Sequence, residues 1–239
     1  MKRVATGLVA GAFLAACIMG GTSSASAGNE HGDFMIRALV TGVQPETDAT
    51  VTAGGARIPG ANADVSNEII PATTLTYFFT DNLAVELFCC FAKLDIDGKG
   101  SIVGLGQIAD TWIFPPALTA QYHFTGMGAW KPYVGVGLQY IAFFDEGTGR
   151  NALGATSVDI DDALGLTLQA GLDVDIGNGW YLNGDVKKTF MDTKIRWNGT
   201  GVRAKADLDP WIFSAGLGYR FNLSDVFGHS AQTASVPIK

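Results

Sequence analysis

The sequence predicts an all-β fold, an eight-stranded antiparallel transmembrane β-barrel. Eight segments of about 10 to 14 residues alternate between apolar and small or polar side chains, with the period of two that is typical of β-strands. The connections between these segments alternate between short turns and long polar stretches. Beyond residue 21 the chain has no apolar run of about 18 residues, which an ordinary transmembrane helix requires. A membrane-spanning part of this chain is therefore expected to be a closed sheet.

The composition excludes several classes of protein. Charged residues make up 16% of the 239 residues, against about 25% in an ordinary soluble domain, and hydrophobic residues make up 47%. The low charge argues against disorder, and the 31 glycines lack the three-residue period of collagen. The formal net charge is −7, and the chain shows no basic stripe, so we expect no nucleic-acid partner.

The amino terminus is predicted to be a targeting segment. Lys2 and Arg3 precede an apolar stretch, residues 4–21, and Ala25 and Ala27 form an A-x-A cleavage signal. We interpret residues 1–27 as a cleaved signal peptide, residues 28–221 as the barrel and residues 222–239 as a polar, flexible periplasmic tail. Two alternatives are an uncleaved membrane anchor and a lipoprotein signal with Cys17 as the lipidated residue.

The first four strands follow from alternation that ends at turn residues. They are predicted at residues Asp33–Val43, Glu68–Thr80, Leu83–Lys93 and Trp112–Phe124. In the second strand Leu75, Tyr77 and Phe79 share one face, and a tight turn at 80–82 ends it. The apolar faces of the third and fourth strands are Val85, Leu87, Cys89 and Phe91, and Leu118, Ala120, Tyr122 and Phe124.

The last four strands are predicted at residues Lys131–Phe144, Leu164–Ile176, Trp180–Met191 and Pro210–Phe221. The sixth has the clearest pattern, because seven apolar residues from Leu164 to Ile176 share one face. The sequence Gly177-Asn178-Gly179 after it is a hairpin signal. In the eighth strand the apolar face carries Trp211, Phe213, Ala215, Leu217, Tyr219 and Phe221.

The lengths of the connections indicate an outer-membrane barrel. Short turns are expected at residues 80–83, 125–130 and 177–179, and long polar loops at 44–67, 95–110, 145–157 and 192–207. Outer-membrane barrels have short periplasmic turns and longer extracellular loops. The alternative is a soluble lipocalin-like barrel, which would have the inverse pattern, apolar inside and polar outside.

Aromatic residues near the strand ends predict two interface girdles. The girdle residues are expected to be Trp112, Trp130, Trp180, Trp197, Trp211, Tyr219 and Phe221. Trp112, Trp197 and Trp211 lie toward the long loops, and Trp130 and Trp180 lie toward the short turns. Phe221 also fits the terminal aromatic residue that aids insertion, so the outer-membrane insertion machinery is an expected partner.

The opposite faces of the strands predict the lining of the lumen. Eight strands leave an interior largely filled by side chains, with space for a small ligand at most. The lumen or gate candidates are Arg37, Leu39, Glu86, Phe88, Gln121, His123, Gln139, Ile141, Asp173, Asp185, Lys187 and Arg220. The charged members are expected either to pair and fill the core or to form a gate.

Motifs across the mature chain resemble those of the OmpW family of Gram-negative outer-membrane proteins. The matching segments are residues 32–38, 110–119, 121–124, 131–137, 208–211 and 218–221, which include Asp110-Thr111-Trp112-Ile113-Phe114-Pro115-Pro116 and Lys131-Pro132-Tyr133-Val134-Gly135-Val136-Gly137. The resemblance implies an eight-stranded barrel with a narrow, rather hydrophobic lumen. It also implies passage of small hydrophobic molecules, with lateral exit into the membrane as one route.

Catalytic and metal-binding motifs are weak. Asp95 and Asp97 resemble the start of a calcium loop, but position twelve is glycine and no helices flank it. Asp159, Asp161 and Asp162 form either a solvated loop or a weak divalent-cation site that bridges to lipopolysaccharide. His123 is expected in the lumen, hydrogen-bonded to Gln121 or water, without a nucleophile motif such as G-x-S-x-G. The adjacent Cys89 and Cys90 are expected on opposite strand faces. We therefore predict no enzyme, no cofactor and no metal.

Two functions of different classes remain. The first is a channel for small hydrophobic molecules across the Gram-negative outer membrane. The second is a non-conducting structural or receptor barrel whose extracellular loops contact other cells, phage, colicins or host molecules. Either would have outer-membrane lipid and lipopolysaccharide around it, and the first would also bind small hydrophobic ligands.

Overall fold

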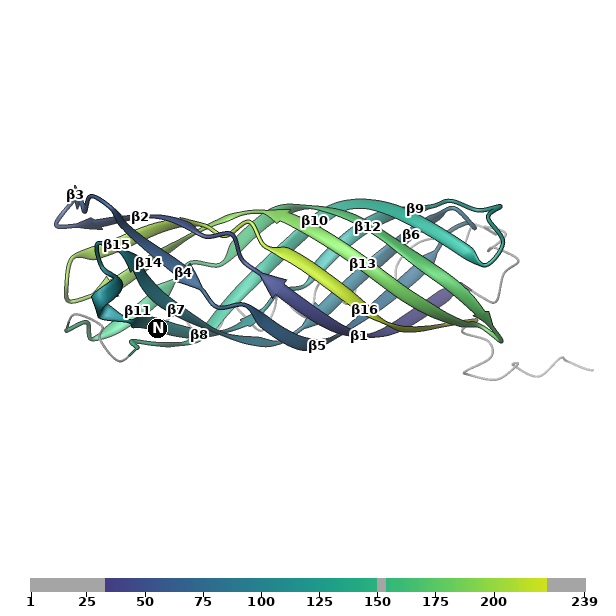
Figure 1. Cartoon of the computed structure of the whole chain (residues 1–239), viewed down its shortest axis with the longest axis horizontal. Coiled ribbons are helices and arrows are strands. Elements are labelled where there is room, and N and C mark those ends of the chain that lie inside the picture. Colours follow the sequence, from purple (N-terminus) through teal and green to yellow (C-terminus); the bar gives the residue numbers. More distant parts are fainter. Residues whose placement is uncertain (1–32, 150–153, 223–239) are drawn as a thin grey trace, which may run out of the picture.

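The computed structural model describes residues 33–149 and 154–222, which form an elongated barrel of antiparallel strands (Figure 1). The predicted signal peptide, residues 1–27, and the tail beyond residue 222 lie outside the described residues. The strands of the described part are β1 (Phe34–Gln44), β2 (Asp48–Ala53), β3 (Ala56–Arg57), β4 (Ala61–Val65), β5 (Glu68–Phe78), β6 (Leu83–Cys90), β7 (Ala92–Gly100), β8 (Gln107–Phe114), β9 (Ala117–His123), β10 (Trp130–Gly147), β11 (Ser157–Ile160), β12 (Ala163–Gly177), β13 (Trp180–Phe190), β14 (Asp192–Asn198), β15 (Val202–Asp207) and β16 (Trp211–Phe221). A short 3-10 helix, η1 (Val103–Leu105), precedes β8. In the described ranges, no helix is long and apolar enough to cross a bilayer.

Eight of these strands close into a barrel. Their order is β1-β5-β6-β9-β10-β12-β13-β16, and each strand is antiparallel to its neighbours. The ladder between β1 and β16 runs from Phe34 opposite Phe221 to Gln44 opposite Trp211. Because the sheet closes on itself here, its backbone groups pair without water. The predicted eight-stranded antiparallel barrel is therefore confirmed.

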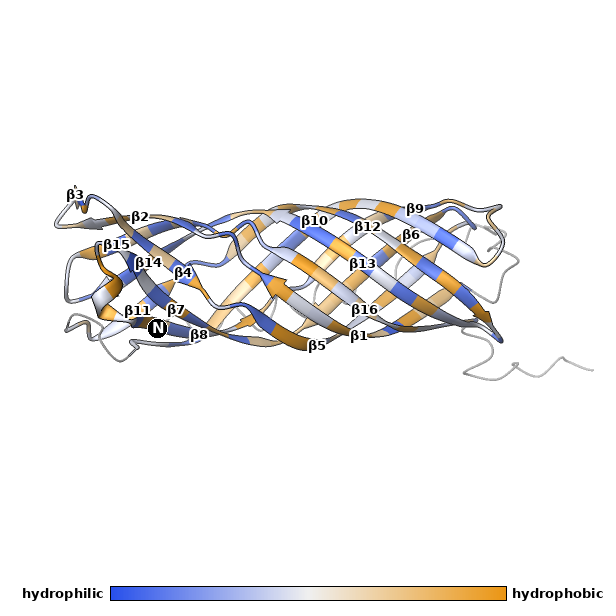
Figure 2. Ribbon diagram, viewed as in Figure 1, coloured by the Kyte–Doolittle hydropathy of each residue, from blue (hydrophilic) through white to orange (hydrophobic). Residues whose placement is uncertain are grey.

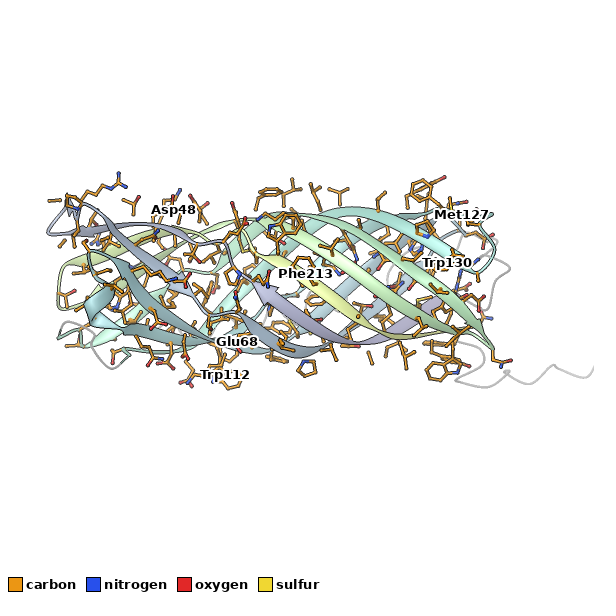
Figure 3. All side chains as sticks on the ribbon, viewed as in Figure 1. Asp48, Glu68, Trp112, Met127, Trp130 and Phe213 are labelled. Carbon is orange, nitrogen blue, oxygen red and sulfur yellow. The ribbon has the colours of Figure 1, made fainter. Side chains whose placement is uncertain are left out.

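Large apolar side chains cover the outside of this eight-stranded part. Three leucines of β12, Leu164, Leu166 and Leu168, are between 45% and 62% exposed, and their neighbours on β10 behave alike. Orange bands mark apolar residues along these strands in Figure 2. Trp112 and Trp130 are both exposed, and Figure 3 shows them far apart along the barrel axis. An apolar surface of this extent, edged with aromatic residues, matches the lipid-facing band of an outer-membrane barrel.

The hairpin predicted at 177–179 connects β12 and β13. Asn178 has a φ of 55°, and the glycines on both sides of it also have positive φ. The backbone N–H of Gly177 donates to Asp175 Oδ1 at 2.8 Å, beside a bulge in the ladder. These left-handed conformations explain why the turn carries Gly and Asn.

The four stretches predicted as polar loops contain strands, so that part of the prediction is wrong. Residues 44–67 hold β2, β3 and β4, and residues 192–207 hold β14 and β15. Residues 95–110 hold most of β7 and the first half of β8, and residues 145–157 hold the end of β10 and the first residue of β11. Their charged residues point outward, while small or apolar residues such as Val51, Ile96 and Ile195 are buried inside. The strands leave the membrane, so water solvates their outer face and charge no longer indicates a loop.

The predicted strand Trp112–Phe124 is interrupted. β8 ends at Phe114, and β9 begins at Ala117 after Pro115 and Pro116. Proline has no N–H to donate to a ladder, so two prolines in succession break the strand. As a result, β9 pairs with β6 inside the membrane band, whereas β8 pairs with β7 above it.

The extracellular extension consists of two sheets that do not pair with each other. One continues β10 through β8, β7 and β4, and the other has the order β11-β14-β15-β2-β3. Two seams separate them. At the β10/β11 seam the Asp162 carboxylate accepts hydrogen bonds from the Tyr140 hydroxyl at 2.5 Å and the Phe143 N–H at 3.1 Å. At the β2/β4 seam Asn62 Oδ1 accepts from Ala49 N–H at 2.7 Å. Side chains therefore join the wall where backbone ladders are missing.

The polarity of the wall reverses along the axis. In the membrane band the outside is apolar and the inside carries polar residues such as Thr74, Thr167 and Gln169. In the extension the inside is an apolar cluster that includes Leu94, Ile195 and Trp197, and the charged residues lie outside. The inverse pattern considered for a soluble barrel is thus present, but only in the extracellular extension.

Candidate functional site

A layer of charged side chains fills the lumen at the level of the membrane. Arg37 of β1 is 1% exposed and donates to both carboxylate oxygens of Asp173, from Nε at 3.1 Å and from Nη2 at 2.6 Å. Its Nη1 donates to Glu86 Oε2 at 2.8 Å and to Thr76 Oγ1 at 2.7 Å. Arginine suits this place because its planar fork can serve several acceptors at fixed angles.

Lys187 forms the other half of this layer. Its Nζ lies 2.5 Å from Asp185 Oδ1 and 3.3 Å from Glu86 Oε1. The Gln169 amide links the two carboxylates, because its Nε2 donates to Glu86 at 2.9 Å and to Asp185 at 2.7 Å. We call Arg37, Glu86, Gln169, Asp173, Asp185 and Lys187 the charged layer.

The side chains of the charged layer come from β1, β6, β12 and β13, so the layer extends across the lumen. Each of its charges has a hydrogen-bonded partner of opposite sign, which is the condition for burying ions at tolerable cost. An ion or an apolar molecule that moved along the axis would have to separate these pairs. The layer therefore closes the axial path in this structure.

Below the charged layer, toward the short turns, the lumen holds an aromatic group. The His123 ring stacks on Tyr133 with centroids 4.7 Å apart and lies 5.0 Å from Phe78. Its Nε2 is 3.0 Å from Gln121 Oε1, and the Arg220 guanidinium lies 3.9 Å from the centre of the Phe78 ring. The hydrogen bond of His123 thus goes to an amide rather than to a nucleophile.

Above the charged layer, apolar side chains line one part of the lumen, beside a buried hydrogen-bonded group of Gln139, Thr167 and Thr189. Phe88 forms the boundary, because Lys187 Nζ lies 4.9 Å from the centre of its ring. Leu39, Ile141 and Ile212 are buried around and above it. Higher still, a small apolar cavity of about 20 Å³ is lined by residues that include Val65, Leu94, Ile96, Phe143, Ile160 and Ile195. Its volume at rest holds about one water molecule, so a larger guest requires the wall to move.

All twelve lumen candidates have side chains inside the barrel. The buried candidates are Arg37, Leu39, Glu86, Phe88, Gln121, His123, Gln139, Ile141, Asp173, Asp185, Lys187 and Arg220. The structure brings five charged members into one layer and leaves Arg220 and His123 below it. Gln169 and Tyr133 were missed as site residues, although alternation assigned them to inward faces. Most of the cavity residues lie in stretches for which the sequence predicts loops, so alternation does not assign them to an inward face.

The girdle prediction needs one correction. Trp112, Trp130, Trp180, Trp211 and Tyr219 are between 37% and 57% exposed on the outer surface, and Phe221 is half-buried beside Phe34. Trp197 is instead 4% exposed, and its Nε1 donates to the Ile108 carbonyl at 3.0 Å. It sits on β14 in the extension, where the apolar face points inward, so it packs the lumen.

The loop motifs have structural partners. Asp159 accepts from Asn198, Asp162 bridges the β10/β11 seam, and Asp161 pairs with Arg196, whose pKa is raised by that hydrogen bond. The three carboxylates therefore have separate partners. Asp95 and Asp97 point outward from β7, and within the described residues no group of three His, Cys, Asp or Glu side chains could hold a metal.

The two cysteines of the barrel lie on β6 with their side chains on opposite faces. Cys89 is half-buried on the lipid-facing side, and Cys90 is buried in the lumen near Phe88. Both thiols are free.

Comparison with known proteins agrees with this arrangement. The model of the OmpW family matches residues 30–221. The chain is 35% identical over 205 residues to the uncharacterized outer-membrane protein y4mB of Sinorhizobium fredii, which covers 84% of each chain. It is 32% identical over 202 residues to outer membrane protein W of Vibrio cholerae, covering 81% of this chain and 90% of that one. The crystal structure of OprG from Pseudomonas aeruginosa matches with a TM-score of 0.75 and 31% identity, over 82% of this chain and 98% of that chain. The chain therefore belongs to the OmpW family of outer-membrane proteins and is located in the outer membrane.

Proposed function

We propose that this barrel passes small hydrophobic molecules from the extracellular side into the outer membrane. One observation carries the proposal: the apolar lumen of the extension descends to Phe88 and stops there against the charged layer. An apolar molecule gains by leaving water for such a lining. It cannot continue toward the periplasm without separating buried ion pairs, so its exit has to be through the wall.

The β10/β11 seam is the exit that best fits this route. Phe143 and Ile160, on its two sides, both line the apolar cavity. Outside its base lie apolar side chains that face lipid, Leu164 at 62% exposure and Phe144 at 39%. Asp162 holds the seam with two side-chain hydrogen bonds, and no ladder has to break when it opens.

The β2/β4 seam also borders the cavity, through Thr47, Ala63 and Val65. Its outer edges carry Glu46, Asp48 and Asp64, so this seam opens toward water. The two seams therefore form a matched pair, one facing lipid and the other facing solvent.

Disulfide locks on the two seams test the route. In a Cys89→Ser/Cys90→Ser background, Phe143→Cys with Asp162→Cys locks the β10/β11 seam, and Ala49→Cys with Asn62→Cys locks the β2/β4 seam. The readout is uptake of naphthalene by a deletion strain that expresses each variant. We expect the oxidised β10/β11 lock to reduce uptake to the level of the deletion strain, with recovery after reduction, whereas the β2/β4 lock leaves uptake unchanged. Normal uptake through the oxidised β10/β11 lock would contradict the proposal.

The second candidate is a non-conducting receptor barrel. The charged layer and the small resting cavity favour it, since neither requires transport. A deletion strain with undiminished naphthalene uptake, together with absent conductance in planar bilayers, would favour this reading. In both readings we expect no catalytic activity, a cleaved signal peptide and insertion by the outer-membrane machinery.

A further inference from the structure

The outer face of the β14–β15 hairpin carries an unusual ladder of cations. Lys194 lies directly opposite Lys205, and Arg196 lies directly opposite Arg203. Their neighbours Thr193, Ile195, Ala204 and Ala206 are buried, so all four cations point outward. We call these four residues the basic face. Like charges at opposite positions of an antiparallel pair, about 5 Å apart at Cβ, destabilise the hairpin.

Protein carboxylates neutralise only half of the basic face. Arg196 pairs with Asp161, and Lys205 lies 3.5 Å from Asp192. For Lys194 and Arg203 no carboxylate lies within 4.0 Å among the residues that the structure describes. Elsewhere the outside of the extension is rich in acidic residues, such as Asp48, Glu68 and Asp97. An external anion would therefore be stabilised beside Lys194 and Arg203, and Arg57, opposite Thr52 on β3, continues the row of cations.

The height of the basic face above the membrane identifies the source of that anion. Phe190, 47% exposed, is the last large lipid-facing residue of β13. Lys194 and Arg196 follow it by four and six residues, which for tilted strands places them about 10 to 16 Å farther out. The outer leaflet of this membrane is lipopolysaccharide, and the core sugars with their phosphate and carboxylate groups lie at this height, beside the barrel wall.

A row of carboxylates separates the basic face from the lipid band. Asp192 lies opposite Asp207, which lies opposite Asp48 on β2. These residues would repel phosphates on the lipid A sugars at the bilayer surface. Outward from the membrane, one acidic row is followed by two basic rows. This order favours binding of anions of the core oligosaccharide over those of lipid A.

We propose that the basic face binds phosphate and carboxylate groups of the lipopolysaccharide core. Arg203 supplies a planar fork for a phosphate, and Lys194 supplies a point charge next to it. Thr50 and Thr52 of β2 flank the two cations of β15 in the ladder and extend the polar surface. The bound core anions offset the repulsion between the opposed cations. This site is independent of transport through the lumen.

Charge reversal on the basic face tests the proposal with the full mature chain in detergent. The test variant is Lys194→Glu/Arg203→Glu. The control is Lys99→Glu, which reverses one exposed cation of β7, in the other sheet of the extension. The probes are purified lipopolysaccharide with a phosphorylated core and lipid A alone. We expect the test variant to weaken binding of core-bearing lipopolysaccharide about tenfold and to change lipid A binding less than about twofold, with the control near wild type for both.

Thermal unfolding in lipopolysaccharide-free detergent distinguishes recognition from damage to the fold. Lys194→Glu alone places opposite charges across the ladder, so its Tm is expected to equal or exceed that of the wild type while core binding falls. Three results would overturn the proposal: unchanged core binding by the double variant, an equal loss for core and lipid A, or an equal loss in the control. Selective loss of binding to soluble dextran sulfate, with core binding intact, would instead assign the basic face to free polyanions and would also overturn it.

Discussion

Replacement of Arg37 by methionine tests the energetics of the charged layer. Arg37→Met keeps the length of the side chain but removes the charge that faces Asp173 and Glu86. Asp173 keeps one donor, Asn183 Nδ2 at 2.9 Å, and Glu86 keeps Lys187 and Gln169. Removing one partner of a buried pair costs about 3–5 kcal/mol, and the remaining donors favour the lower end of this range.

A loss of about 3 kcal/mol lowers the ratio of folded to unfolded protein by more than about 100-fold. Urea unfolding of the barrel in lipid vesicles, followed by tryptophan fluorescence, measures this loss of stability as a shift of the midpoint urea concentration. Arg37→Lys keeps a charge but loses the bidentate contact with Asp173, so we expect an intermediate loss. Arg57→Met, on the exposed β3, is the control and should change stability by less than about 0.5 kcal/mol.

Coupling provides the decisive comparison. Asp173→Asn removes the charge that Arg37 pairs with, so the double variant Arg37→Met/Asp173→Asn leaves fewer unpaired charges than Arg37→Met alone. We expect the double variant to cost at least about 1 kcal/mol less than the sum of the single variants. A cost of Arg37→Met below about 1 kcal/mol, or strict additivity, would refute the view that buried pairing holds this layer together.

Three further substitutions probe other parts of the barrel. Trp197→Ala should lower the free energy of unfolding, measured with urea, by about 3–5 kcal/mol because it empties a buried site. A loss below about 1 kcal/mol would indicate that Trp197 lies at the lipid interface instead. Gly171→Val should lower stability by about 1–3 kcal/mol, since a Cβ there meets the buried ring of Tyr133, and the additional change Tyr133→Ala should reduce this penalty; no reduction would disprove the contact. The pKa of Glu46 is lowered by its hydrogen bond to Lys188, so its stabilising effect is present at neutral pH and is lost as the pH falls through the folded-state pKa. Glu46→Gln should therefore lower Tm at neutral pH, and this difference in Tm should shrink as the pH falls through the folded-state pKa; a Tm difference independent of pH would contradict that sign.

The membrane band could be predicted from sequence because lipid imposes one rule on every outward position. The alternation from Leu164 to Ile176 identified β12, and the same pattern placed Arg37, Glu86 and Lys187 inside. Which charges pair could not be predicted, since it depends on register between strands far apart in sequence, as for Arg37 and Asp173.

The extension was harder to predict from the sequence, because the outside of the extension contacts water whereas the outside of the membrane band contacts lipid. Its outer faces meet water, so strands such as β14 and β15 carry the charges that elsewhere indicate loops. For the same reason the basic face does not show as a basic stripe along the sequence. Lys194 and Arg203 are separated in sequence by buried residues and a turn, and only the ladder brings the cations onto one face.

The reversal of wall polarity also fixes the depth at which the barrel sits in the bilayer. Asp192, which faces water, follows Phe190, which faces lipid, by only two positions. If the barrel sank by that distance, Asp192 and Asp207 would enter the acyl region, where each charge is unfavourable to an extent that grows with depth. If it rose, Phe190 and Phe213 would lose their lipid contacts. Vertical displacement is opposed in both directions, so the seam beside Leu164 stays level with the outer leaflet.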